Sequence, residues 1–339
     1  MRMMRSVVVA TALLTAALPA LAQAKWNVQR TMQVGGQGGW DYVTVDAANH
    51  RLFLPRQTHT LVLDENTGKV LGDIPGQKSA HGVAIVPAVG RGFITDGGGQ
   101  GAIEIFDLKT YAVLGKVVTL PDSDGIIYDK GSNRVLAVAG DSNALISLDP
   151  SVDPNHGGFE KIDLGGAPEF FAADGAGKVY VNLENKDLVA VVDLKSKTVQ
   201  ARWPTAPGGH PVGMAIDTAN HVLFVGARKP QKMLVIDTTS GKIIAALPIG
   251  MGNDAVAFSN GQSFASCFDG TVTVVGKQGG TYAIQQVIKT AQGARTMGVD
   301  PETHTLYLPT ADFEPMVPGA SGRPKMKPGT FKVVVVKQQ

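Results

Sequence analysis

The sequence predicts an all-β protein, specifically a seven-bladed β-propeller of four-stranded blades, because two repeats run in phase along its 339 residues. In one, an apolar run carries a position that recurs every 40 to 45 residues. In the other, an aspartate ends a later run at steps of 43, 42, 44 and 44 residues: Asp64, Asp107, Asp149, Asp193 and Asp237. Four short apolar runs per unit, separated by Gly, Asn and Asp turns, are typical of a propeller blade.

Each unit has the same four elements in the same order. The first run ends at an aspartate in most copies, and the second has an apolar and aromatic centre, as in residues 52–54, 179–181, 223–225 and 306–308. The third run ends in Asp, followed in two copies by Thr67-Gly68-Lys69 and Ser240-Gly241-Lys242. The fourth is short and aliphatic, as in residues 70–71 and 243–245. Helical periodicity of useful length is missing, which favours an all-β fold.

Seven units can be counted, and the two chain ends belong together. The units begin near Trp40, Ser79, Asp122, Gly166, Gly208, Gly250 and Ala291. The last unit lacks a complete fourth run after residues 333–336, while a strand-like stretch from Trp26 to Val34 precedes the first unit. We expect this N-terminal strand to complete the last blade and close the ring, because closure removes exposed sheet edges.

Residues 1–24 have the pattern of a secretory signal peptide. Arg2 and Arg5 precede an apolar stretch that ends at Ala22-Gln23-Ala24, which fits a small-x-small cleavage site. The remaining chain, residues 25–339, is predicted to be one exported domain, periplasmic or secreted, monomeric and without a membrane span. It has 29 basic and 29 acidic residues. This balance argues against a nucleic-acid partner.

The repeat motifs also resemble a known family. The Asp-x5-Leu-Phe/Tyr-Val and Val-x-Asp-x-x-Thr/Ser-Gly-Lys patterns are similar to the YVTN repeat of exported, YncE-like seven-bladed propellers. The resemblance covers essentially the whole chain after residue 24, and residues 166–170, 210–213, 293–297 and 303–313 carry it most clearly. It implies the fold and an extracytoplasmic location, but little about activity, because propellers host binding and catalysis alike.

The first-run repeat predicts a ring of charged residues. The recurring positions are Asp41, His81, Asp124, Glu169, Val212, Asp254 and Arg295. In a propeller the first strand of each blade lines the central channel, so these residues should meet at one mouth. Four carboxylates there would repel one another unless a cation, Arg295 or bound protons relieved the repulsion.

Several ligands fit such a ring. Asp41, Asp124, Glu169 and Asp254, with the Asn253 amide as a neutral donor, would suit a hard ion such as calcium or magnesium. His81 and His210 would instead favour zinc or another transition metal. Alternatively, the charges cap a water-filled channel and pair with Arg295 and with Arg56 or Arg228.

Three functions follow from these alternatives. The first is an exported binding or scaffold protein that holds a metal or small polar ligand at the mouth. The second is a metal-assisted hydrolase, lyase or isomerase, with Glu169 or His81 as the base and Arg295 holding an anionic group. The third is a protein-interaction scaffold that uses its rim loops.

One irregular segment interrupts the seventh unit. Residues 313–330 are rich in Pro and Gly and contain Arg323, Lys325 and Lys327. The segment is predicted to connect the second and third strands of this unit. Long connections in compact domains are often functional, so it is expected either to cover the mouth as a lid or basic arm, or to be a solvated loop.

Overall fold

The computed structural model describes residues 25–315, 322 and 324–339 and confirms an all-β fold. These residues form 27 strands and two short 3₁₀ helices, η1 (Ala47–Asn49) and η2 (Pro87–Val89). Within the described part of the chain, no helix is long and apolar enough to cross a membrane. The predicted signal peptide, residues 1–24, lies outside the described residues.

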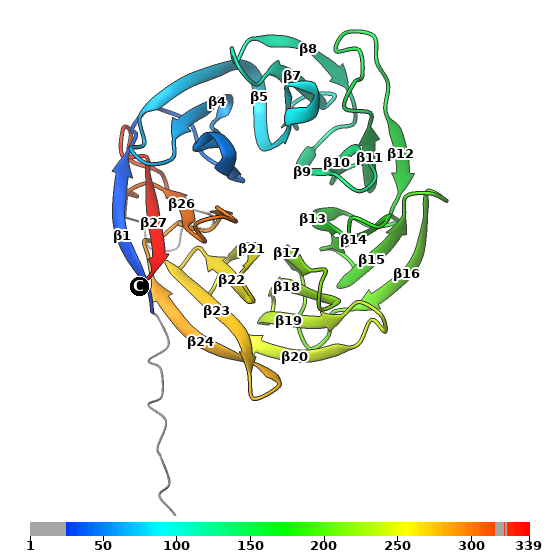
Figure 1. The fold of residues 1–339 in the computed structure, drawn as a ribbon, viewed down its shortest axis with the longest axis vertical. Coiled ribbons are helices and arrows are strands. Elements are labelled where there is room, and N and C mark those ends of the chain that lie inside the picture. The colour runs from blue at the N-terminus through cyan, green and yellow to red at the C-terminus, as the bar shows by residue number, and fades with distance from the viewer. Residues whose placement is uncertain (1–24, 316–321, 323) are drawn as a thin grey trace, which may run out of the picture.

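The strands form antiparallel sheets that stand side by side around a common axis (Figure 1). One sheet has seven strands, in the order β2 (Thr44–Asp46), β3 (Arg51–Pro55), β4 (Gln57–Asp64), β5 (Val70–Val86), β6 (Arg91–Asp96), β7 (Ala102–Asp107) and β8 (Val113–Val118). Two sheets of four follow along the chain: β9 (Ser123–Asp129), β10 (Arg134–Ala139), β11 (Ala144–Leu148), β12 (Glu160–Asp163); and β13 (Pro168–Ala173), β14 (Lys178–Leu183), β15 (Leu188–Asp193), β16 (Thr198–Pro204).

Three further sheets also have four strands each. Two of them are β17 (Pro211–Asp217), β18 (Val222–Arg228), β19 (Gln231–Asp237), β20 (Ile243–Pro248); and β21 (Asn253–Ser259), β22 (Gln262–Cys267), β23 (Thr271–Gln278), β24 (Thr281–Lys289). The last combines both chain ends, in the order β1 (Trp26–Gln33), β27 (Lys332–Gln338), β26 (Leu306–Thr310) and β25 (Gly298–Val299).

The N-terminal strand is a full member of this last sheet. β1 pairs antiparallel with β27, from Trp26 opposite Gln338 to Gln33 opposite Lys332. The Trp26 indole packs edge-on against Phe264, 4.7 Å between ring centres, and its Nε1 donates to Gln262 Oε1 at 3.0 Å. Both partners belong to β22, so β1 also ties its sheet to the neighbouring one.

The repeated aspartates hold turns. At the end of β4, Asp64 Oδ1 accepts hydrogen bonds from the backbone N–H groups of Asn66 and Thr67. The same carboxylate-to-amide bonding recurs at Asp107, Asp193 and Asp237. Such side-chain bonds replace backbone partners in a tight turn. The aspartate that ends the third strand of these units therefore has a structural role. The recurring charged position, which carries Asp41, His81 and Asp124, makes no such turn and lies at the channel mouth.

Candidate functional site

Asp41, His81 and Asp124 come together from three places in the chain: Asp41 precedes β2, His81 lies within β5, and Asp124 lies near the start of β9. His81 Nδ1 lies 2.8 Å from Asp41 Oδ2 and 3.4 Å from Asp124 Oδ1. Backbone contacts between adjacent segments hold them there: Tyr42 N–H donates to His81 O at 3.1 Å, and the Thr95 hydroxyl donates to Asp124 O at 2.5 Å. One atom from each of the three side chains lies within 4.8 Å of the other two.

Across the mouth, Asp254 lies between two arginines. Arg228, at the end of β18, and Arg295, just before β25, both form ion pairs with its carboxylate, which is almost completely buried. Arg228 Nη2 is also 3.8 Å from Glu169 Oε1, and Arg295 Nη1 is 3.8 Å from Asp41 Oδ1. Arg228 Nε donates to Asn253 O at 2.8 Å, and Arg295 Nη2 donates to Trp40 O at 3.1 Å. These bonds anchor both guanidinium groups.

Burial and crowding shift the proton affinities at the mouth. Burial raises the pKa of Asp124 to about 7, with His81 opposing and Asp41 reinforcing the shift. Burial and the charge of Asp124 raise the pKa of Glu169 to about 8, against the effect of Arg228. Burial by itself would lower the pKa of His81, but the hydrogen bond to Asp41 and the charges of Asp124 and Asp41 outweigh it and raise this pKa to about 9.

The structure separates the predicted site residues into groups. Asp41, His81 and Asp124 form one cluster, whereas Glu169 and Asp254 are bound to arginines. Of the outlying candidates, His210 Nε2 lies 3.0 Å from Glu184 Oε2, and its backbone N–H donates to Asp187 at 2.6 Å.

Asn253 is fully buried and has a structural part. Its amide nitrogen donates to the carbonyls of Ala255 and Ser266, at 3.0 and 2.9 Å. These bonds span the register shift between β21 and β22. The amide therefore stabilises the local backbone and is not grouped with the three clustered ligand atoms.

The sequence offers Arg56 as one possible partner of the charged ring, but the structure gives it other partners. Its fully buried guanidinium donates to the carbonyls of Gly39, Gln37 and Gly38 at 2.8 to 2.9 Å, and it lies 3.6 Å above the Phe331 ring. Burial lowers its pKa to about 10. Arg56 thus holds the backbone of residues 37–39, which lead to Asp41.

Two nearby residues escaped the sequence prediction. Ser79 Oγ lies 3.0 Å from His81 Nε2; its signal in the sequence is the spacing of two residues, which places both side chains on one face of a strand. Tyr42, directly after Asp41, packs on Phe170 with ring centres 4.7 Å apart. Burial and then the charges of Asp124, Glu169 and Asp41 raise the pKa of Tyr42 well above its usual value. It stays a neutral phenol beside the carboxylates.

Two adjoining cavities open onto this mouth. One, of about 310 Å³, is lined by Asp41, His81, Ser79, Arg295 and the aromatic side chains of Trp40, Phe268 and Phe313. The other, of about 600 Å³, shares Phe268, Arg295 and Pro324 with it. Phe313 and Pro324 belong to the predicted insertion, so its described residues do border the mouth. Residues 316–321 and 323 of that segment lie outside the described residues.

The cluster is suited to binding a cation. Ser79, His81 and Asp41 also form the hydrogen-bonded series of a nucleophile, a base and an orienting carboxylate. However, a histidine whose pKa is about 9 keeps its proton at neutral pH and is then no base. A metal ion can displace that proton from Nδ1 and bind the same two carboxylates.

Comparison with known proteins identifies the fold. No family model matches the chain, and no curated protein matches it in sequence. Among solved structures, it is similar to a chain of the mitotic checkpoint complex, with 10% identity over 99% of both chains and a TM-score of 0.73. It is also similar to hydrazine synthase of Kuenenia stuttgartiensis, with 13% identity, 83% of this chain and 95% of the other covered, and a TM-score of 0.70. Both neighbours are β-propellers, so this chain has the β-propeller fold that its repeats predict.

Proposed function

We propose that this protein is a β-propeller binding protein that holds a divalent metal ion between Asp41, His81 and Asp124 at its channel mouth. The observation that carries the proposal is the convergence of two carboxylate oxygens and one imidazole nitrogen within 4.8 Å. The ion-pair partner of Asp124 is His81, which carries a positive charge only while its imidazole is protonated. A metal ion replaces this proton with two positive charges and so stabilises both carboxylates better.

The ligand set favours zinc or a similar transition metal over calcium. Imidazole nitrogen is a ligand typical of zinc, whereas calcium takes six to eight oxygen atoms. The oxygen-only set expected from the sequence is divided in the structure, because arginines bind Asp254 and Glu169. The proposed metal site therefore has one nitrogen ligand, from His81, and two oxygen ligands, from Asp41 and Asp124.

We further propose seven blades and a closed ring. The seven-stranded sheet corresponds to two blades, with the long β5 serving as the outer strand of one and the inner strand of the next. Its pairing with β4 shifts register between Gln57 and His59, where such a division would fall. The pairing of β1 with β27 supports closure by the N-terminal strand. We also propose that residues 25–339 are exported, on the signal-peptide pattern of residues 1–24.

Zinc titration by isothermal calorimetry tests the metal site. Chelator-treated protein should bind one Zn²⁺ per chain, and the double variant His81→Asn, Asp124→Asn should bind none. His210→Gln is the matched control, because His210 pairs with Glu184 away from the cluster. Calcium should bind more weakly than zinc. Equal zinc binding by the wild type and the double variant would refute the proposal.

A metal-assisted hydrolase is the second candidate. Three protein ligands leave a coordination position for water or substrate, as in catalytic zinc sites. The adjoining cavity of about 310 Å³ has room for a small molecule. The pKa of Glu169 is about 8, so this residue is ionised and can act as a base at pH 9. Zinc-dependent turnover of small esters or lactones at that pH, lost in Glu169→Gln with zinc affinity retained, would support this candidate. The rim-loop scaffold stays a prediction without a residue to identify its partner.

A further inference from the structure

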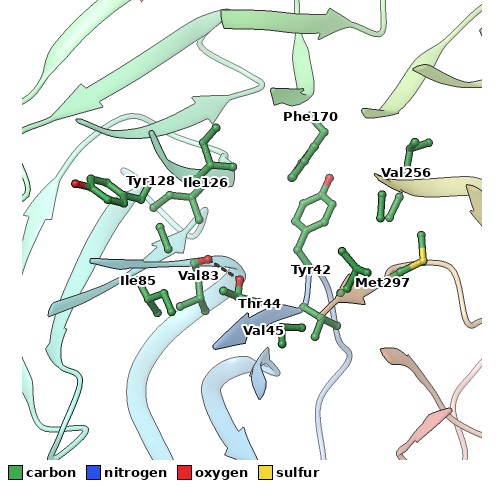
Figure 2. A pocket seen from close by; sticks show the side chains of 17 residues that line it. Tyr42, Thr44, Val45, Val83, Ile85, Ile126, Tyr128, Phe170, Val256 and Met297 are labelled. Carbon is green, nitrogen blue, oxygen red and sulfur yellow. Dashed lines mark hydrogen bonds between the residues drawn. The ribbon is translucent and has the colours of Figure 1, made fainter. Parts of the chain in front are cut away.

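A third cavity lies in the central channel, on the other side of Tyr42 from the metal cluster. Its volume is about 380 Å³, and innermost strands of several sheets line it (Figure 2). We propose that this channel binds a second ligand, an uncharged molecule with an unbranched alkyl chain. This proposal does not depend on the metal site.

Most of the side chains that line the channel are apolar, whereas backbone groups and the hydroxyls of Tyr42, Thr44 and Tyr128 form a polar part of the wall. Val83, Ile126, Val256 and Met297 line the channel together with half-buried aliphatic side chains such as Val45. The Thr44 hydroxyl donates to Val83 O at 2.6 Å (Figure 2). The Tyr128 hydroxyl donates to Asn133 Oδ1 at 2.8 Å. Ordered water needs two to four polar partners. Because Thr44 and Tyr128 already have partners for their hydroxyls, water beside the aliphatic side chains has few polar partners there, and an alkyl chain gains free energy by replacing it.

Tyr42 and Phe170 separate the channel from the charges of the mouth. Their rings pack together and line the same cavity (Figure 2). This aromatic pair lies between the channel and Asp124, so a molecule in the channel does not contact the charged residues of the mouth. We therefore expect entry from the opposite face, where Val45 and Ile85 stand one residue before the ends of β2 and β5.

The volume and the shape select the ligand class. A cavity of 380 Å³ is at the lower end of small-molecule sites. Most of the lining residues form runs of three or four positions along the chain, so the cavity extends roughly 10 Å along the strands, a length that an alkyl chain can fill. Burial of each methylene contributes roughly 0.8 kcal/mol. Affinity in a series of n-alkanols should therefore rise about fourfold per added methylene until the channel is filled.

Fluorescence of N-phenyl-1-naphthylamine, an uncharged apolar dye, provides the test. The full protein should enhance the dye fluorescence in a saturable, one-to-one manner, and hexanol, octanol and decanol should displace it in order of increasing affinity. Val45→Phe narrows the channel and should weaken both ligands at least tenfold. Val287→Phe is the matched control on an exposed outer position of β24.

Two further variants keep the result interpretable. If Val45→Phe does not fold, Val299→Phe narrows the channel from another strand. His81→Asn should bind the dye normally, which distinguishes this site from the metal site. No saturable enhancement, the same loss in Val287→Phe, or alkanol affinities independent of chain length would overturn the proposal.

Discussion

The two sides of the channel mouth neutralise their buried carboxylates in different ways. On one side, the buried Asp254 carboxylate is neutralised by the permanent charges of Arg228 and Arg295. On the other, Asp41 and Asp124 surround His81, whose charge depends on a proton. The arginine side is a fixed structural element, because a guanidinium does not release its proton in proteins.

This difference locates the place where function can reside. A proton on His81 can exchange for a metal ion, whereas neither arginine can exchange its charge. Four acidic residues with similar places in the repeat therefore have unequal roles. The ion that a residue faces decides its role, although Arg295, 3.8 Å from Asp41 Oδ1, borders both sides.

The largest effect is expected from removing the permanent cations. Replacing Arg228 and Arg295 together with Met leaves Asp254 charged and buried, which should cost about 3–5 kcal/mol of unfolding free energy. Urea denaturation measures this loss. Arg134→Met is the control, because Arg134 forms a more exposed pair with Glu160 at 3.1 Å and should cost about 0–1 kcal/mol. Adding Asp254→Asn should restore part of the stability; equal losses in both variants would contradict the comparison.

The next effect concerns the hydrogen bond behind His81. Ser79 Oγ holds Nε2 and leaves Nδ1 toward the carboxylates, so Ser79→Ala should weaken zinc binding about 10–100-fold, as loss of an outer partner of a ligand does. Ser79→Thr keeps the hydroxyl and should restore most of the affinity. Calorimetric titration measures both. A positioning effect leaves the melting temperature of the metal-free protein unchanged, so an equal fall of stability and affinity would argue against it.

A smaller effect is expected from pH. Burial raises the pKa of Glu169 to about 8 and that of Asp124 to about 7, and the pKa of His81 is about 9. All three exceed their unfolded values, so the folded state binds more protons than the unfolded state and stability falls as pH rises. The carboxyl contributions are lost from about pH 4 to 8 and that of His81 from about 6.5 to 9.

Thermal melts of metal-free protein at pH 6, 7.5 and 9 measure this dependence. The melting temperature should fall by a few degrees toward pH 9, and Glu169→Gln should make the fall smaller. Saturating zinc should also make it smaller, because the bound ion stabilises the ionised carboxylates. A melting temperature that rises over this range would refute the assignment.

The smallest effect is expected at His210. Its pair with Glu184 is partly exposed, with 40% and 29% of the two side chains accessible, so His210→Ala should cost at most about 1 kcal/mol. The zinc affinity of the His210→Ala variant should equal that of the wild type. Loss of zinc binding in this variant would show that the two histidines act together, as one sequence hypothesis proposed.

Much of the fold could be predicted because the repeat is local. Asp64, Asp107, Asp193 and Asp237 form turns with residues two or three positions further on, so their spacing reveals the strand ends. The position of Asp41, His81 and Asp124 before or within an innermost strand follows from the same period. The N-terminal strand was also expected beside the last one, and β1 does pair with β27.

The sequence by itself therefore determined the strand order, the turns and the common place of Asp41, His81 and Asp124 in the repeat, because these follow from spacing along the chain. Only the tertiary structure decided which charges pair. Arg56 and Arg228 both end or follow a second strand, yet one binds backbone carbonyls under Phe331 and the other binds Asp254. Long side chains from strands about 40 residues apart choose among partners by distance and burial, and neither quantity is present in a repeat pattern.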